Sequence, residues 1–196
     1  MDPISNKAAL ASAGTGDDAT YVDDVFSTFI VDGAGGQTIT NGIDLSTEGG
    51  MVLSKARAAA ASWGVHDTER GVNKFLQFNS DAAEIDVSGI SSQHTISSFN
   101  TDGFTTGEDQ GYGIVDYNGY GSYVHSTFRK APGFFDIVTY TGNGTLRTIS
   151  HNLGSTPGFI IIKRYSATED WTCWHRSVGA TKYLLFLILV NQLFSF

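Results

Sequence analysis

Apolar and polar residues alternate most clearly in the stretch from Gly133 to Arg164. Between residues 134 and 139 every second side chain falls on the same face, and this period of two predicts a β-strand. Gly142-Asn143-Gly144 follows and supplies the positive φ values that a tight hairpin turn needs. The run Phe159–Ile162 is short, apolar and β-branched, which predicts a strand buried on both faces.

The same pattern occurs earlier in the chain, at an offset of about 108 residues. Leu45 matches Leu153 and Leu76 matches Leu184, so the offset stays at 108 between these positions. Other matched pairs are Phe26 with Phe135, Gly33 with Gly142, Gly35 with Gly144, Gly50 with Gly158, Lys55 with Lys163, Trp63 with Trp171, Gly71 with Gly179 and Lys74 with Lys182. A repeat of this length predicts tandem domains rather than a solenoid of short repeats.

The repeat divides the chain into four parts. Residues 1–22 form an arm rich in Ala, Ser, Gly and Asp, which is either disordered or an anchor to a larger assembly. Residues 23–130 form a complete unit, and Ala131-Pro132-Gly133 is the joint, since proline cannot donate a hydrogen bond within a strand. Residues 133–184 repeat the first half of that unit only, and 185–196 are an apolar tail with no counterpart.

Short alternating runs predict an all-β first unit. The expected strands are Val25–Val31, Gln37–Thr40, Met51–Lys55, Trp63–Asp67, Lys74–Phe78, a strand–turn–strand over Thr95–Thr105, and Ser122–Phe128. Ala56–Ser62 holds five alanines and is either a helix or a loop. In the second unit the counterpart of the strands in residues 95–128 is missing, so we expect exposed sheet edges there.

Composition and charge limit the classes of function that the chain can have. The 23 glycines fit many strands joined by tight turns, and 41% hydrophobic residues suffice for a core. A net charge of −8 argues against a nucleic-acid surface, which needs Lys and Arg. No secretory signal is visible at the start, and Tyr183–Phe196 is shorter than a membrane-spanning helix, so we expect no membrane insertion. The single Cys173 is expected to be a small buried residue.

Candidate chemistry is sparse, and we expect no enzyme activity, cofactor or metal. The histidines (His66, His94, His125, His151 and His175) show no metal-ligand spacing. The carboxylates of Asp81, Glu84, Asp86 and Asp102 could supply a glycosidase pair, although solvated loop charges are the simpler interpretation. Gly33–Gly36 lacks the Gly-Lys-Ser/Thr ending of a phosphate loop and is expected to be a hairpin turn.

One loop is the candidate recognition surface. Tyr112, Tyr117, Tyr120 and Tyr123 stand among Gly, Asn and Asp residues between positions 108 and 123. Tyrosine gives a large contact area at low entropic cost, and a glycan could stack on such rings. The alternative is a subunit contact or a loop without a binding role.

Several motifs resemble one family. They are Asp23–Phe29, Thr38–Leu45, Glu48–Gly50, Asp67–Gly71, Ser98–Thr105, Phe128–Asp136 and His151–Gly158. Over residues 20–184 the chain resembles tail-fibre or virion structural proteins of tailed bacteriophages, notably marine and cyanobacterial phages. The resemblance implies β-sandwich domains of the jelly-roll, lectin-like kind. The chain departs from the family at Ser54, where an apolar or aromatic residue is usual, and after Leu184, where the family continues.

This resemblance implies a non-enzymatic virion protein, made in the host cytoplasm and located in the tail rather than the capsid. It would be a tail-fibre-like or tail-attached component that contacts the host surface. A capsid decoration, head-fibre or minor shell protein is the alternative, and a glycan-degrading enzyme is a third. Expected partners are other virion proteins through the arm of residues 1–22, further copies of the chain, with a trimer favoured, and a host surface glycan.

Overall fold

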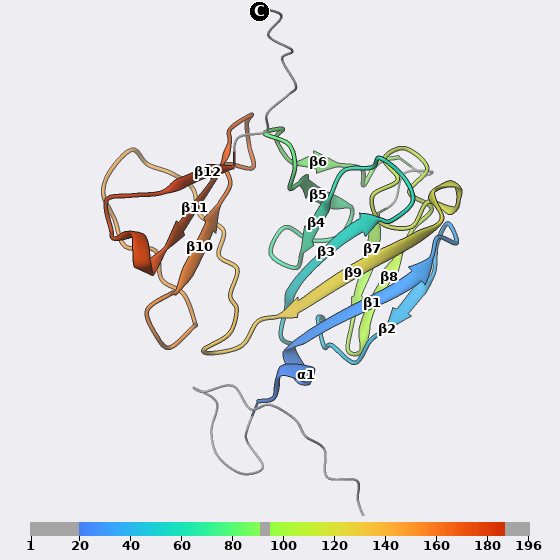
Figure 1. Ribbon diagram of the computed structural model, residues 1–196, viewed down its shortest axis with the longest axis horizontal. Helices are drawn as coiled ribbons and strands as arrows, with labels where there is room; N and C mark the ends of the chain where they lie inside the picture. The colour runs from blue at the N-terminus through green and yellow to red at the C-terminus, as the bar shows by residue number, and fades with distance from the viewer. Residues whose placement is uncertain (1–19, 91–94, 187–196) are drawn as a thin grey trace, which may run out of the picture.

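The first unit contains a six-stranded antiparallel sheet (Figure 1). The computed structural model describes residues 20–90 and 95–186. The sheet has the order β1-β9-β3-β4-β5-β6. Its strands are β1 (Phe26–Asp32), β3 (Gly50–Ala56), β4 (Gly64–Asp67), β5 (Lys74–Gln77), β6 (Ile85–Asp86) and β9 (Ser122–Arg129), and the short helix α1 (Val22–Val25) precedes β1.

A three-stranded sheet of order β2-β8-β7 forms the second layer. It consists of β2 (Thr38–Thr40), β7 (Ile96–Asn100) and β8 (Gly103–Thr106), and a 3₁₀ turn, η1 (Asn118–Tyr120), precedes β9. The core between the layers contains Ile39, Ile43, Leu45, Val52, Ile96, Phe104 and Val115. The prediction of an all-β sandwich is confirmed, and 57–63 are a loop rather than a helix.

Strand β3 shows how the sequence pattern fixes the layers. Its alternate residues Val52, Ser54 and Ala56 are buried against the second sheet, whereas Met51 and Leu53 face outward and are half-buried. On one side β3 pairs with β4, and on the other it pairs with β9 over seven residue pairs, from Gly50↔Arg129 to Ala56↔Tyr123. Strand β3 therefore has both a covered inner face and two paired edges.

In its described residues the second unit repeats the middle of this sheet. Strands β10 (Phe159–Ile162), β11 (Trp171–His175) and β12 (Leu184–Phe186) form an antiparallel sheet of order β10-β11-β12, with the 3₁₀ turn η2 (Arg176–Val178) between the last two. Met51 pairs with Asp67 in β3–β4, and Phe159 pairs with His175 in β10–β11. All four residue pairs keep this offset of 108, so the repeat holds in register as well as in sequence.

Two expectations for the second unit are wrong, and both fail for the same reason. Residues 136–157, which include the expected hairpin around Asn143, contain no strand. Among the described residues the counterpart of this segment, β1, pairs only with β9, and the part of the second unit that the structure describes has no strand equivalent to β9. The residues of β10 are 38–50% exposed instead of buried on both faces, because neither a β9-like strand nor a second layer within residues 20–90 and 95–186 covers them.

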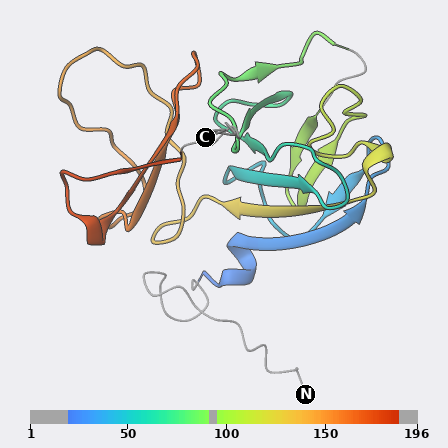
Figure 2. The same ribbon diagram turned by 45° about the horizontal axis from the view of Figure 1, so that its top comes forward.

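Contacts at one end of the β10–β12 sheet join the two units, which lie beside each other (Figure 2). Trp171 packs against Leu76 and Val65 on the outer face of the six-stranded sheet, and its ring lies 4.9 Å from that of Phe78. Its Nε1 donates hydrogen bonds to the carbonyls of Gln77 and Ser80. The second unit is therefore attached to the first through Trp171, which is the counterpart of Trp63 in the repeat.

Candidate functional site

The predicted recognition loop is built around a buried tyrosine. Tyr123 on β9 is fully buried, and its hydroxyl donates to the carbonyl of Gly113 at 2.9 Å and accepts from the N–H of Tyr117 at 3.2 Å. Ile114 and Val115, in the middle of the loop, are core residues. Tyr123 therefore anchors the loop to the sandwich and offers no surface to a ligand, contrary to its predicted place in the recognition surface.

Only two of the four predicted tyrosines form a common surface. Tyr117 and Tyr120 are half-buried, with their rings edge-to-face at 5.0 Å. Gly113 has a φ of 61°, and a Cβ there would collide with the ring of Tyr120, so the glycine lets the ring lie on the backbone. Tyr112 packs edge-on against Phe75, with 5.0 Å between ring centroids. The candidate surface is thus reduced to the Tyr117–Tyr120 pair.

The buried carboxylate of Asp116 connects this loop to the β1–β2 turn. It accepts hydrogen bonds from the backbone N–H groups of Ala34 (2.8 Å) and Gly36 (2.9 Å), and from the hydroxyl of Thr106 at 2.6 Å. Gln37 Nε2 donates to it as well, at 2.8 Å. Asp116 therefore fixes the backbone on which Tyr117 is carried.

A second buried carboxylate, Asp109, closes the base of the loop. Its Oδ2 accepts a hydrogen bond from the N–H of Val115 at 2.6 Å. Burial raises the pKa of Asp109 to about 6, although backbone hydrogen bonds from Val115 and its neighbours oppose the rise. With its charge held inside the loop, Asp109 orders the backbone and does not reach a solvent-exposed substrate.

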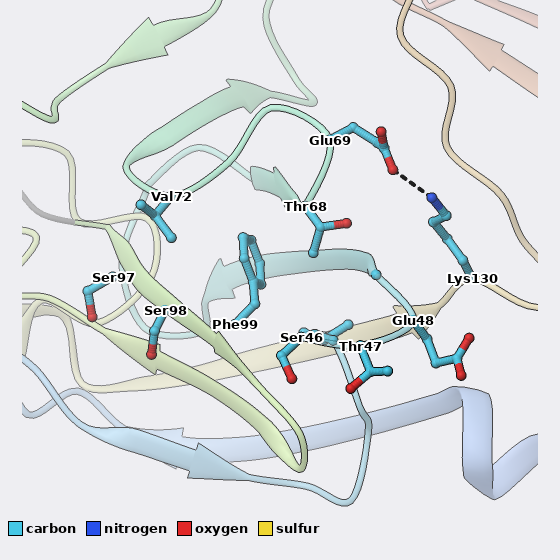
Figure 3. Close-up of a pocket in the computed structure, with 12 residues that line it drawn as sticks. Ser46, Thr47, Glu48, Thr68, Glu69, Val72, Ser97, Ser98, Phe99 and Lys130 are labelled. Carbon is cyan, nitrogen blue, oxygen red and sulfur yellow. Dashed lines mark hydrogen bonds and ion pairs between the residues drawn. The ribbon is translucent and has the colours of Figure 1, made fainter.

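A second candidate site is a hollow at one end of the sandwich, with a volume of about 510 Å³ (Figure 3). The ring of Phe99, from β7, stands in the middle of the labelled side chains. The rest of the lining is rich in hydroxyl groups and comprises Leu45, Ser46, Thr47, Glu48, Gly49, Thr68, Glu69, Val72, Ser97, Ser98 and Lys130. An aromatic ring among hydroxyl and carboxylate groups can contact a sugar through both its apolar face and its hydroxyls.

An ion pair occupies one wall of this hollow. Lys130 Nζ lies 2.6 Å from Glu69 Oε1, and this hydrogen bond is the main reason that the pKa of Lys130 is raised. The carboxylate of Glu69 is thus engaged by a lysine at the wall of the hollow.

Comparison with known proteins supplies a family but no activity. Residues 22–193 match the family described as Domain of unknown function (DUF7483). The chain belongs to this family. No curated protein and no solved structure matches it. The match spans both units of the repeat, so the DUF7483 domain includes the β10–β12 sheet as well as the complete sandwich.

Two of the other candidate carboxylates of the DUF7483 chain are held in ion pairs. Glu84 lies 3.4 Å from Arg70, and Asp86 lies 3.8 Å from Lys74. Asp102 is in the β7–β8 turn. These contacts tie Glu84 and Asp86 to separate cations, which is the arrangement of structural ion pairs rather than of a glycosidase pair.

Two of the five histidines are buried in the sandwich. His66 and His125 have pKa values lowered to about 3 and about 4, in both cases mainly by burial. His125 Nδ1 lies 2.9 Å from Ser54 Oγ, yet both residues are fully buried, so a substrate cannot reach this pair. His151 and His175 are exposed, and His94 lies outside the described residues.

Within the described ranges, no three His, Cys, Asp or Glu side chains gather into a possible metal site. In the same residues no helix is long and apolar enough to span a bilayer. Cys173 is buried, as predicted.

Sequence reasoning missed Asp116, Asp109 and the hollow around Phe99. An available signal was the carboxylate of Asp116 directly after the apolar pair Ile114-Val115, since a charge next to a core segment needs hydrogen-bond partners. The hollow had no sequence signal, because its lining comes from four segments that are far apart in the chain.

Proposed function

We propose that this DUF7483 chain is a non-enzymatic structural component of a tailed-phage virion, in a tail-fibre-like or tail-attached position. The observation that carries the proposal is the exposed strand β10, in which all four apolar residues are 38–50% exposed. An uncovered apolar strand invites pairing with another chain, and soluble monomeric proteins avoid it. The resemblance of residues 20–184 to phage tail-fibre proteins favours a phage tail as the assembly in which this pairing occurs.

The test is the location of the protein in purified particles. Mass spectrometry of gradient-purified virions should detect the chain, and gold-labelled antibodies against the first unit should mark the tail. Gold on the capsid shell would instead support the alternative of a head decoration or minor shell protein. Absence of the chain from intact virions would refute both positions.

Contact with a host surface glycan is the finer part of the proposal. Two surfaces support it: the half-exposed Tyr117–Tyr120 pair and the hydroxyl-lined hollow around Phe99. Binding of the purified protein to host cells should fall when Phe99 or Tyr120 is replaced by alanine. The matched control is Tyr140→Ala, because Tyr140 is 45% exposed and neither lines the hollow nor belongs to the tyrosine pair. Unchanged binding in both test variants would exclude these two surfaces.

A further inference from the structure

Strand β10 has a free edge where its counterpart has a partner. In the first unit the corresponding edge of β3 is paired with β9 over seven residues. In the second unit β10 pairs only with β11 among the described residues. Since the β3–β4 and β10–β11 registers are the same, the internal repeat shows which kind of strand the free edge accepts: an antiparallel one.

The repeat also indicates which side chains suit a strand that pairs with the free edge of β10. On β3, Ser54 Oγ is hydrogen-bonded to Nδ1 of His125 on β9. The residue of β10 that corresponds to Ser54 is Ile162, which has no group to bond to a histidine. An apolar residue therefore suits the position opposite Ile162 better than a histidine does, because Ile162 offers an apolar contact and no hydrogen bond.

Another strand of the same chain meets these requirements. Strand β1 is the edge of the six-stranded sheet and pairs only with β9 in the described part of the chain. It is seven residues long, it ends in its single charged residue, Asp32, and its middle residues Phe29 and Ile30 are 37% and 56% exposed. Phe29 lies opposite His125 on β9, so its side chain faces the inner side of the sandwich.

We infer that β1 of a second copy of the chain pairs with β10, antiparallel and edge to edge. Among the registers that keep the inner faces of both sheets on one side, the one with the most apolar facing pairs sets Phe29 of the second copy opposite Ile162. The same register sets Val31 opposite Ile160 and Ile30 opposite Ile161. Every facing pair in the middle of the junction is then apolar, and the sheet runs on from one copy into the next.

The two edges differ, so the junction is of the head-to-tail type. Each copy uses β10 to accept a neighbour and keeps its own β1 to join another, which produces rings when the rotation closes and filaments when it does not. This inference goes beyond the proposed function, since it concerns the isolated chain in solution and holds for an assembly of any kind.

The test uses one lysine on each edge, because a charge on an edge strand blocks pairing with another strand. Ile161→Lys alters the accepting edge and Ile30→Lys the joining edge; Ile90→Lys is the matched control, since Ile90 is 42% exposed but lies on neither edge. Analytical ultracentrifugation of the full chain should show association of the unaltered protein and of Ile90→Lys. Each edge variant alone should remain monomeric at the same concentrations, with an unchanged circular dichroism spectrum.

Mixing the two edge variants gives the decisive result. Ile30→Lys keeps an intact β10 and Ile161→Lys keeps an intact β1, so an equimolar mixture should form dimers and nothing larger. If Ile161→Lys alone stops association while Ile30→Lys does not, β10 pairs with a second β10 and the inference is overturned. Association of both variants alone overturns it as well. So does a monomeric unaltered protein, including one that associates only after residues 187–196 are deleted.

A covalent test covers the case in which a lysine variant fails to fold. A chain carrying Ile30→Cys is mixed with a chain carrying Ile161→Cys, both in a Cys173→Ala background, and the mixture is oxidised. The proposed register sets these positions opposite each other, so a disulfide-linked heterodimer should form at micromolar concentration. The control pair, Ile90→Cys with Ile161→Cys, should not form one. Equal cross-linking of both pairs would overturn the inference.

Discussion

Acidification should destabilise the sandwich through its two buried histidines, and His66→Leu should remove about half of that loss. His66 has a pKa of about 3 in the fold, because it is buried and lies near the positive charge of Arg70. The pKa of an unfolded-chain histidine is about 6.5. A depressed pKa favours the neutral ring in the fold, so this stability is present above pH 6.5 and is lost as the pH falls towards 3.

The size of the loss follows from these values. Between pH 7 and pH 5, His66 contributes a loss of about 2 kcal/mol in the free energy of unfolding. His125, with a pKa of about 4, contributes about 2 kcal/mol more by the same linkage. Asp109 acts in the opposite direction, because its pKa is raised to about 6. Its protonation between pH 7 and pH 5 increases the free energy of unfolding by about 1 kcal/mol. The net loss is therefore about 3 kcal/mol, which is a large part of the stability of a domain of this size.

The assay is urea unfolding at several pH values between 5 and 7.5, followed by tryptophan fluorescence. In His66→Leu, the free energy of unfolding should fall by about 2 kcal/mol less between pH 7 and pH 5 than in the unaltered protein. His151→Leu is the matched control, because His151 is exposed. An unchanged pH dependence in His66→Leu would refute the argument, as would an NMR titration that gives folded His66 an ordinary pKa.

Four other predictions concern the arm, the second unit and the absence of activity. Deletion of Met1–Ala19 should leave the thermal unfolding of the first unit unchanged and prevent incorporation into virions, and normal incorporation would contradict an anchoring role. The isolated fragment 131–196 should aggregate, associate or remain disordered, because Trp171 attaches it to the first unit; a monomer that unfolds cooperatively in dilute solution would disprove this. Trp171→Ala in the full chain should cost about 3 kcal/mol, measured by urea unfolding, whereas Trp63→Ala, at a 38% exposed position, should cost clearly less. Purified protein should release no saccharide from host polysaccharide, and release that is lost in Glu84→Gln or Asp102→Asn would overturn the non-enzyme assignment.

The strands of the first unit could be predicted because each has its own local signal. The alternation of β3 and β9 is visible in the sequence, and both strands occur within one or two residues of the expected positions. The repeat was equally visible, and the β10–β11 register confirms it. Alternation shows which residues can form a strand, and the first unit supplies every such strand with a partner.

The errors arise where a strand depends on a distant partner. Residues 134–139 carry the pattern of a strand, yet pairing requires a neighbour equivalent to β9, and this need has no local signal. The exposure of β10 has the same origin, since β-branched residues are equally typical of a buried strand and of an unpaired edge. Tyr123 was misassigned because a tyrosine beside glycines can anchor a loop or bind a ligand, and only its burial separates the two roles.

The long separation between β1 and β9 has a consequence for biosynthesis. The β3–β5 meander is contained in residues 50–77, whereas Phe26 on β1 must meet Phe128 on β9, about 100 residues later. Contacts between close residues form faster than contacts between distant ones. The meander can therefore form while the ribosome is still translating the chain, and β1 has to wait, unpaired, until β9 has left the exit tunnel. Chaperones that bind extended apolar segments should therefore be found on β1 of stalled nascent chains that end before Ser122, and should be absent from chains that extend well past Arg129.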